Sequence, residues 1–300
     1  MDTQSLRAFL TVAEHSSFSL AAEALELTQP AVSKRIANLE TQTGTRLFDR
    51  IGRRVTLTEA GRTLLPKARE VLVLVDDTQR ALANLNRDVR GSLTLGTSHH
   101  VGLHRLPPVL KGYTRDYPDV RLDMRFLDSE QAYQAVLDGA LELAVVTLAP
   151  QPDPALTVVP VWVDHLRFVC AREHPLAGAE ALALEDLTHH EAVMPGHMTF
   201  TRGIVTERFA QAGLEINVGL STNYLETLKM MASIGLGWSV LPETLIDGEL
   251  CVLPVGHTPI RRPLGYLYHR SRTLSNAARA MIERLEVVRR SNVATQGREN

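Results

Sequence analysis

The spacing of apolar residues predicts a short amphipathic helix between Leu27 and Leu39. Thr28 can cap the start of this helix, because its hydroxyl can accept a free backbone N–H, and Pro30 suits the first turn. The inward side is apolar and the outward side is polar near its N-terminal end. The inward residues are Ala31, Val32, Ile36 and Leu39, and the outward ones are Gln29, Ser33, Lys34 and Arg35.

A second helix is predicted just upstream, from Phe18 to Leu25, with Ser19 as its cap. Only Glu26-Leu27 separates the two helices, which is typical of a helix-turn-helix. Amide, hydroxyl and cationic side chains are the types that contact base edges and phosphates. We therefore expect double-stranded DNA as a partner, with Gln29 and Lys34 on bases. The remaining contacts are assigned to Thr28, Pro30, Ser33 and Arg35.

A β-hairpin is predicted after this helix, in the place of a wing. Gly44 can end the helix in a left-handed conformation, and Leu47–Arg50 and Arg53–Leu57 read as strands around an Ile51-Gly52 turn. Residues 28 to 65 carry seven basic and three acidic side chains, although the whole chain has a net charge of −2. A solvated basic surface is the alternative interpretation. We expect Arg50, Arg53 and Arg54 to hold the DNA backbone or minor groove.

From Met1 to Leu65 the sequence closely resembles the N-terminal domain of LysR-type transcriptional regulators. The spacing of the matching residues runs without a gap, and the rest of the chain agrees more loosely, with Glu142 where the family usually has Asp. The matching residues are Phe9, Val12, Ala13, Ser17, Phe18, Ala21, Ala22, Leu25, Thr28, Gln29, Pro30, Ala31, Val32, Ser33, Leu39, Glu40, Gly44, Leu47, Phe48, Arg50, Leu57, Thr58, Ala60 and Gly61.

A long helix is predicted over residues 58 to 86. Its apolar residues follow a coiled-coil spacing, so we interpret it as a dimerisation helix that spaces two DNA-binding heads. Packing within one subunit is the alternative. Pro66 predicts a kink or a restart. The predicted seam is Leu64, Ala68, Val71, Val75, Thr78, Leu82 and Leu85.

Strands and helices alternate after Gly91, which predicts an α/β domain with parallel sheets. Prolines between Pro150 and Pro160 suggest a crossover loop, and the polar tail Ser291–Asn300 is expected to be disordered. The predicted strands are Leu93–Gly96, Arg121–Phe126, Leu141–Thr147, Leu166–Ala171, Ala192–Met194, Ile216–Leu220, Leu250–Leu253 and Leu264–Tyr268. The predicted helices are His104–Tyr117, Gln131–Asp138, Thr201–Ala212, Tyr224–Ser233 and Ser275–Arg289.

The family resemblance implies how these parts are divided. It implies a winged helix-turn-helix over residues 1–58, a linker helix over 59–87 and a regulatory domain over 88–300. The regulatory domain would hold two Rossmann-like α/β subdomains, like a periplasmic binding protein, with the chain crossing between them twice. Subdomain I would span 91–161 and 266–300, and subdomain II 162–265. The resemblance further implies a tetramer and a small-molecule effector between the subdomains.

Polar residues follow several of the predicted strands, where open α/β sheets bind ligands. Backbone N–H groups, hydroxyls and Arg202 would suit an anionic effector. The alternative is that each cluster only caps its helix. The expected effector residues are Thr97, Ser98, His99, Leu127, Asp128, Thr199, Phe200, Thr201, Arg202 and Asn223.

Composition removes several other classes of protein. No run of about eighteen apolar residues suggests a membrane span, and no signal peptide opens the chain. Two cysteines in apolar strands, Cys170 and Cys251, fit a reduced cytoplasm and inert thiols. We expect no enzyme, since Ser98-His99-His100 is read as an extended segment whose side chains diverge. We expect no metal, because His189, His190 and His197 show no regular ligand spacing with Cys, Asp or Glu. We expect no cofactor, and no Gly-rich phosphate loop is found. An effector-independent repressor or architectural protein is the alternative function.

Overall fold

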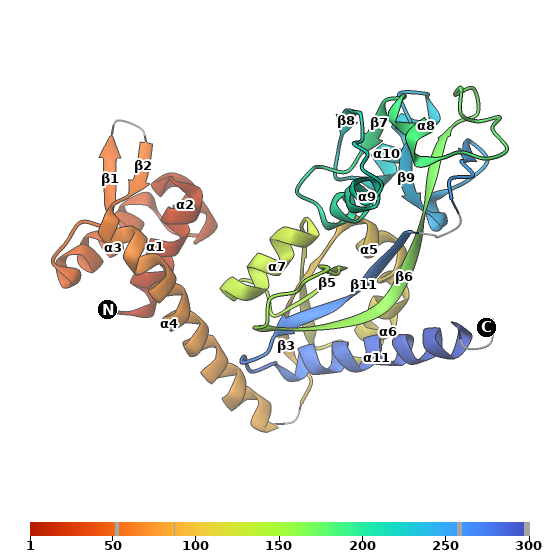
Figure 1. Ribbon diagram of the computed structural model, residues 1–300. Coiled ribbons are helices and arrows are strands. Elements are labelled where there is room, and N and C mark those ends of the chain that lie inside the picture. Colours follow the sequence, from red (N-terminus) through yellow and green to blue (C-terminus); the bar gives the residue numbers. More distant parts are fainter. Residues whose placement is uncertain (52–53, 87, 257–259, 297–300) are drawn as a thin grey trace. The chain divides into compact units, whose positions relative to one another are not determined.

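The computed structural model describes residues 1–51, 54–86, 88–256 and 260–296. It divides into two compact units, Met1–Leu85 and Asn86–Asn300 (Figure 1). The first unit is a helix-turn-helix followed by a hairpin and a long helix, as predicted. Its elements are α1 (Thr3–His15), α2 (Phe18–Ala24), α3 (Gln29–Thr43), β1 (Phe48–Ile51), β2 (Arg54–Leu57) and α4 (Glu59–Ala83).

The helices of the first unit begin and end at local capping residues. Thr28 is the N-cap of α3 and Gly44 ends this helix with a φ of 70°, as predicted. The cap of α2 is Ser17, whose hydroxyl accepts the N–H of Leu20, so the assignment to Ser19 was wrong. A cap is the extended residue before the first turn, and Ser19 already lies inside the helix.

The hairpin and α4 share one core with the three short helices. The Phe48 ring on β1 lies 5.3 Å from that of Phe9 and 5.8 Å from that of Phe18. Gly61 on α4 approaches the chain so closely that a Cβ there would lie 2.2 Å from the carbonyl oxygen of Leu47. The main buried residues are Leu6, Phe9, Val12, Phe18, Val32, Ile36, Leu39, Leu47, Phe48, Ala68 and Leu72.

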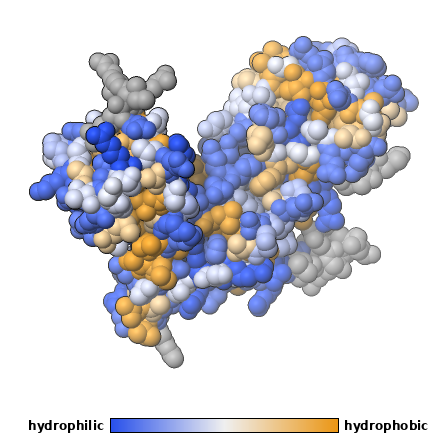
Figure 2. All heavy atoms as spheres, turned by 60° about the vertical axis from the view of Figure 1, so that its left-hand side comes forward, coloured by the Kyte–Doolittle hydropathy of each residue, from blue (hydrophilic) through white to orange (hydrophobic). Residues whose placement is uncertain are grey.

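Helix α4 runs through Pro66 without a break, so the predicted restart is wrong. Leu64 and Ala68 on either side of the proline pack on the core of the same unit, which holds the helix across the lost hydrogen bond. This part of the predicted seam therefore serves its own subunit. Beyond it, apolar side chains on α4 and just after it stay exposed (Figure 2): Val71, Leu74, Leu82 and Leu85.

The second unit is built on a seven-stranded sheet in the order β10-β6-β11-β5-β3-β4, with β9 paired to β6. A separate pair, β7 and β8, forms a small parallel sheet. The strands are β3 (Gly91–Thr97), β4 (Val120–Phe126), β5 (Leu143–Thr147), β6 (Leu156–Ala171), β7 (Ala192–Met194), β8 (Val218–Ser221), β9 (Ser239–Pro242), β10 (Leu250–Val252) and β11 (Ile260–His269).

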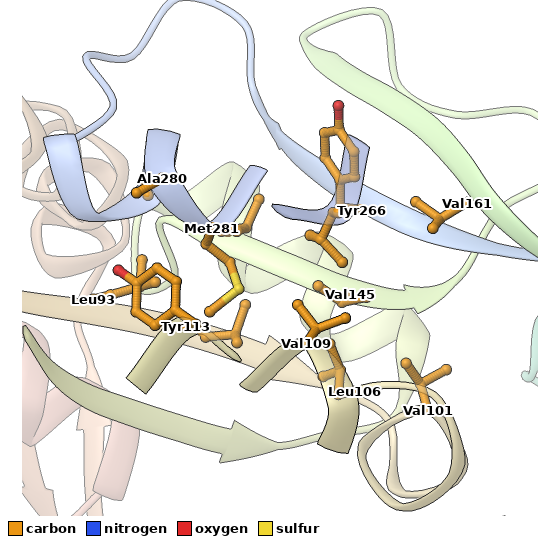
Figure 3. Close-up of a cluster of buried hydrophobic side chains, with 14 of the residues drawn as sticks. Leu93, Val101, Leu106, Val109, Tyr113, Val145, Val161, Tyr266, Ala280 and Met281 are labelled. Carbon is orange, nitrogen blue, oxygen red and sulfur yellow. The ribbon is translucent and has the colours of Figure 1, made fainter. Parts of the chain in front are cut away.

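Helices cover both faces of this sheet. Side chains alternate along β5, with Val145 facing the core under α6 and α11 (Figure 3) and Ala144 facing α7. The helices are α5 (His99–His104), α6 (Pro107–Asp116), α7 (Ser129–Asp138), α8 (Leu184–Thr188), α9 (Phe200–Ala210), α10 (Leu225–Ser233) and α11 (Asn276–Gln296), with 3-10 turns η1 (Asn84–Asn86) and η2 (Glu243–Leu245).

We call the part with β3, β4, β5, α5, α6, α7 and α11 lobe 1, and the part with β7 to β10 and α8 to α10 lobe 2. The long strands β6 and β11 pair with each other and carry the chain out of lobe 1 and back. The expected α/β fold with two subdomains and two crossings is confirmed. The sheet is mixed rather than parallel, however, because β11 returns antiparallel to both β5 and β6.

Only the end of the predicted crossover loop is wrong: residues 148–155 form no strand, but β6 begins at Leu156 and continues through Pro160. Pro160 pairs with Gly265 next to a shift in register, a position where a strand tolerates a residue without an N–H. A Cβ on Gly265 would lie 2.0 Å from the carbonyl oxygen of Val159. The close approach of the two strands therefore needs glycine here.

Three further expectations need correction. The helix predicted from His104 starts only at Pro107, as α6, and His104 is instead the last residue of a separate helix, α5. The segment Ser98-His99-His100 is not extended, since Ser98 is the N-cap of α5. The tail predicted to be disordered continues α11 to Gln296, and residues 297–300 lie outside the described part.

Candidate functional site

The first candidate site is the exposed side of α3. Gln29, Pro30 and Lys34 are exposed, while Ser33 and Arg35 are half-buried. The Gln29 side-chain amide donates to the Ser33 hydroxyl at 3.1 Å, so these two form one polar pair. Arg35, by contrast, bonds to a side chain on another helix.

The guanidinium of Arg35 donates to the Gln4 side chain on α1 at 3.0 Å. The Thr28 hydroxyl accepts the backbone N–H of Ala31 and therefore caps α3. Among the residues predicted for DNA, Gln29, Ser33 and Lys34 thus share the outer surface of α3, and Thr28 starts the helix.

The turn before α3 has a distinctive backbone. Glu26 adopts a φ of 53°, the left-handed region that non-glycine residues rarely enter. The N–H of Leu27 bonds to the carbonyl of Ala22, which closes the turn tightly. This geometry sets the angle between α2 and α3, and so aims the polar side of α3.

The structure describes the backbone positions of Arg50 and Arg54 in the hairpin, two of the arginines predicted to contact DNA. Arg50 pairs with Val55, and Ile51 pairs with Arg54, so both arginines lie next to the turn. Arg53 lies outside the described residues.

The second candidate site is a cavity of about 280 Å³ between lobe 1 and lobe 2. Seven of the ten predicted effector residues line it: Ser98, His99, Leu127, Asp128, Thr199, Thr201 and Asn223. The lining also contains residues that the sequence reading missed: His100, Phe126, Ser129, Glu130, Gln131, Thr147, Pro195, Tyr224, Leu225 and Arg262.

Three predicted effector residues do not line the cavity. Thr97 is fully buried and its hydroxyl donates to the carbonyl of Val145. The Phe200 ring packs against Tyr133, and Arg202 donates from its Nε to Thr206 on the same helix. The direction of the side chain keeps each of these three residues out of the lining. Neither the type of the residue nor its position after a strand predicts that direction.

Four helices begin at the cavity. Their N-cap residues, Ser98 of α5, Asp128 of α7, Thr199 of α9 and Tyr224 of α10, all belong to its lining. Free backbone N–H groups at helix N-termini attract anionic groups. One carboxylate of the protein already uses this property: Glu130 accepts the N–H of Phe200, in the first turn of α9, at 2.5 Å.

The lobes also touch directly at the cavity. The Asn223 side-chain amide in lobe 2 donates to Asp128 in lobe 1 at 2.6 Å and accepts the N–H of Gly196 at 3.0 Å. Burial raises the pKa of Glu130 above its usual value, although the N–H of Phe200 opposes this shift. The cavity is thus bordered by two acidic residues that make contacts across it.

A buried ionic cluster lies where β6 and β11 cross between the lobes. Asp164 on β6 accepts from Arg262 on β11 at 2.5 Å, from Arg105, and from His100 at 3.1 Å. Burial alone would raise the pKa of Asp164, but the hydrogen bond from His100 and the charge and hydrogen bonds of Arg262 and Arg105 hold it well below the usual range. Asp164 is therefore ionised.

The same region holds a group of potential metal ligands. His100 and His104 of α5 and Glu226 of α10 each offer a ligand atom, and these atoms lie within 4.8 Å of one another. Burial lowers the pKa of His100 despite the hydrogen bond with Asp164. Its ring is therefore neutral at pH 7.

The two cysteines lie opposite each other on adjacent strands, Cys251 on β10 and Cys170 on β6. Both are free thiols. Burial raises the pKa of Cys170 to about 11, so its thiol is protonated and unreactive at neutral pH. Cys251 is only half-buried, which differs from the expectation of two buried thiols.

Comparisons with known proteins cover both units. A family model described as the LysR substrate binding domain matches residues 86–289. A model of bacterial regulatory helix-turn-helix proteins of the lysR family matches residues 3–62. None of the helices in the described segments is long and apolar enough to cross a membrane.

Similar proteins include a probable RuBisCO transcriptional regulator of Synechocystis sp., 30% identical over 287 residues, which covers 92% of this chain and 83% of the relative. The solved structure of full-length CbnR complexed with its target DNA has a TM-score of 0.64 at 20% identity, over 96% of this chain and 100% of that one. The effector binding domain of QuiR in complex with shikimate has a TM-score of 0.60 at 18% identity, over 65% of this chain and 95% of that one. At these identities the structures show a shared fold.

Proposed function

This chain belongs to the LysR family of bacterial transcriptional regulators, and from this premise we propose that a small molecule in the cavity between its lobes modulates its operator binding. It is a DNA-binding regulator with an effector-binding domain, in a family of regulators rather than enzymes. The observation that carries the proposal is the convergence of four helix N-termini on one cavity between two lobes. Binding to chromosomal DNA would place the protein in the cytoplasm.

The DNA half of the proposal depends on α3 and the hairpin. Gln29 and Lys34 would read base edges in the major groove, because both are exposed near the N-terminal end of α3. Arg50, Arg53 and Arg54 would contact phosphates or the minor groove beside it. Arg35 would reach a phosphate only by leaving Gln4.

The effector half predicts a small polar molecule with an anionic group. Ser98 and Thr201 present hydroxyls, and the guanidinium of Arg262 borders the same cavity. Glu130 supports an anionic effector, because its carboxylate accepts the N–H of Phe200 in the first turn of α9. This contact shows that a helix N-terminus at the cavity binds a carboxylate. Arg262 takes the role that the sequence reading gave to Arg202.

Effector binding would act through the direct contacts between the lobes. A ligand that displaces the bond between Asn223 and Asp128 changes how lobe 2 rests on lobe 1. In a dimer or tetramer joined through α4, this change would alter the spacing of the DNA-binding heads and the bend of the operator. We also propose the domain limits that the family resemblance implies: 1–58 for the DNA-binding domain, 59–87 for the linker helix and 88–300 for the regulatory domain.

Two variants test the DNA half, after footprinting on genomic DNA with the purified protein has identified an operator. Arg53→Ala should weaken binding almost equally on the operator and on unrelated DNA, and should reduce the salt slope by about one. Gln29→Ala should reduce the preference for the operator, by about 1–3 kcal/mol for each base that the side chain no longer recognises. Fluorescence anisotropy at several salt concentrations measures both. Identical behaviour of the two variants would refute this division of roles.

The effector half is tested with Ser98→Ala and Thr201→Ala. A thermal-shift screen of small carboxylic acids should first find a ligand that stabilises the full-length protein. Titration calorimetry should then show weaker binding of that ligand by both variants, because each loses a hydroxyl that lines the cavity. If no compound stabilises the protein, the effector-independent repressor becomes the better description. Unchanged affinity in both variants would move the site elsewhere.

A further inference from the structure

We propose that His100, His104 and Glu226 form a binding site for a divalent transition metal ion of the Zn²⁺ type, which fastens lobe 1 to lobe 2. The two histidines belong to α5 in lobe 1, and the glutamate belongs to α10 in lobe 2. This site shares His100 with the lining of the proposed effector cavity, but a metal ion here does not require an effector.

The three side chains already lie together. His100 and His104 are four residues apart on one helix, so their rings share a face, with centroids 4.9 Å apart. The Nε2 of His104 lies 2.9 Å from Oε1 of Glu226. Ligand atoms around one tetrahedral zinc ion lie about 3.3 Å apart, given bond lengths of about 2.0–2.2 Å. Small side-chain rotations would therefore place all three around an ion.

Asp164 prepares His100 to act as a metal ligand. This buried carboxylate lies 3.1 Å from Nε2 of His100 and is held by Arg262 and Arg105, so it accepts the Nε2 proton. The lone pair of the ring is then on Nδ1. A histidine that donates one N–H to a carboxylate and binds a metal through its other nitrogen is a common arrangement in metal sites.

Two buried atoms of this group lack a partner. Nδ1 of His100 and Oε2 of Glu226 have no hydrogen-bond partner among the described residues. His100 is 95% buried, being only 5% exposed. Buried polar atoms rarely stay unpaired, and these two are both electron-pair donors in one small cluster. A cation would satisfy both of them at once.

The surrounding charges do not oppose a cation. The two guanidiniums of Arg105 and Arg262 both face Asp164, and Glu226 supplies a second negative charge. These four groups together are neutral. Two imidazoles and one carboxylate favour Zn²⁺, Co²⁺ or Ni²⁺ over Mg²⁺ and Ca²⁺, which prefer oxygen ligands only. The fourth position would take water.

The test uses full-length protein freed of metal with a chelator and titrated with Zn²⁺ in a calorimeter. His104→Ala and Glu226→Gln should each weaken the binding by on the order of 100-fold, because each removes a direct ligand. Bound Co²⁺ should give the visible absorption of a site with nitrogen ligands, and both variants should lose it. Circular dichroism checks that they fold.

His165→Ala is the matched control, because His165 also lies near a glutamate, Glu243 at 3.9 Å, but belongs to no three-ligand group among the described residues. It should bind Zn²⁺ like the wild type. Zn²⁺ should also raise the unfolding temperature of the wild type but not of Glu226→Gln, because the ion joins the lobes. Unchanged Zn²⁺ affinity in His104→Ala and Glu226→Gln would overturn the proposal. So would loss of binding on changing the edge-to-face pair His174 and His190 instead.

Discussion

At the scale of single residues, buried charges organise the centre of the larger unit. Asp164 and Arg262 lie in long strands, 98 residues apart in sequence, and meet because β6 and β11 pair in register. A buried ion pair is costly unless each charge is well satisfied, and Asp164 meets this condition with three donors. Neither residue was predicted from the sequence, because a charged residue within a strand does not indicate which residue it pairs with.

Glu130 gives a prediction for pH dependence. Burial raises the pKa of Glu130 in the folded protein, so folding is favoured when this residue is protonated and is opposed as pH rises through its folded pKa. Glu130→Gln keeps an acceptor for the N–H of Phe200 but carries no charge. The variant should therefore unfold at a higher temperature than the wild type at pH 7.5.

The difference between Glu130→Gln and the wild type should disappear near pH 3, where the glutamate is almost entirely neutral in both the folded and the unfolded protein. Unfolding temperatures of the two proteins, measured from acidic pH up to pH 7.5, give this difference. A stabilisation that is the same at both pH values would show that ionisation of Glu130 is not its cause.

At the scale of elements, helix ends follow local signals while strand lengths do not. Thr28 and Gly44 cap α3 as the sequence indicates, and Thr58 caps α4 in the same way, because capping involves only residues within a turn of the end. Strand β6 continues through Pro160, which alone predicts a break. Pairing with β11, far along the chain, leaves Val161 of β6 unpaired between the pairs Leu264–Trp162 and Gly265–Pro160, and this bulge accommodates the proline.

Gly61 links α4 to the hairpin and gives a prediction at this scale. Gly61→Ala would place a Cβ 2.2 Å from the carbonyl oxygen of Leu47, and that oxygen also accepts the N–H of Thr58. We expect a loss of about 1–3 kcal/mol in the free energy of unfolding of the N-terminal unit. The control is Gly203→Ala on α9.

Gly203 is exposed, and a Cβ at this position would meet no atom within 4 Å. Alanine there should therefore be neutral or stabilise its helix by up to about 1 kcal/mol. Denaturant unfolding of both variants measures the contrast. Equal effects would show that the close approach of Gly61 to Leu47 is not what restricts this position.

At the scale of the whole molecule, α4 has two roles along its length. Its first turns complete the core of the DNA-binding unit through Ala68 and Leu72. Farther on, Leu74 is 67% exposed and Leu82 63% exposed, which is costly for a solitary helix in water. The exposed residues Val71, Leu82 and Leu85 continue the coiled-coil spacing of the predicted seam, which supports a second copy of this chain as the partner.

Leu82→Glu tests this dimer. Two leucines that each contribute about 2 kcal/mol would be lost from a symmetric interface, which weakens dimerisation roughly 1,000-fold. Sedimentation equilibrium should show monomers at micromolar concentration, with helix content unchanged. Val287→Glu on α11 is the control, since Val287 is also 63% exposed, and it should leave the dimer intact. A Leu82→Glu protein that stays dimeric would contradict the interface.

The sequence by itself determined the features that depend on neighbouring residues. The order of the helices in the N-terminal unit, the cap at Thr28, the polar side of α3 and the alternation of strands and helices all follow from local spacing. Seven of the seventeen residues that line the cavity were found in the same way, because they lie at or next to the N-terminal ends of helices. The family match to residues 1–65 rests on the same local pattern.

Only the tertiary structure decided which distant residues meet. Arg262 replaced Arg202 at the cavity because a strand, not a helix, delivers it there. His104 and Glu226 are 122 residues apart and become neighbours only when α5 and α10 face each other across the lobes. Spacing along a chain fixes which face a side chain occupies, but the packing of separate elements fixes what it faces.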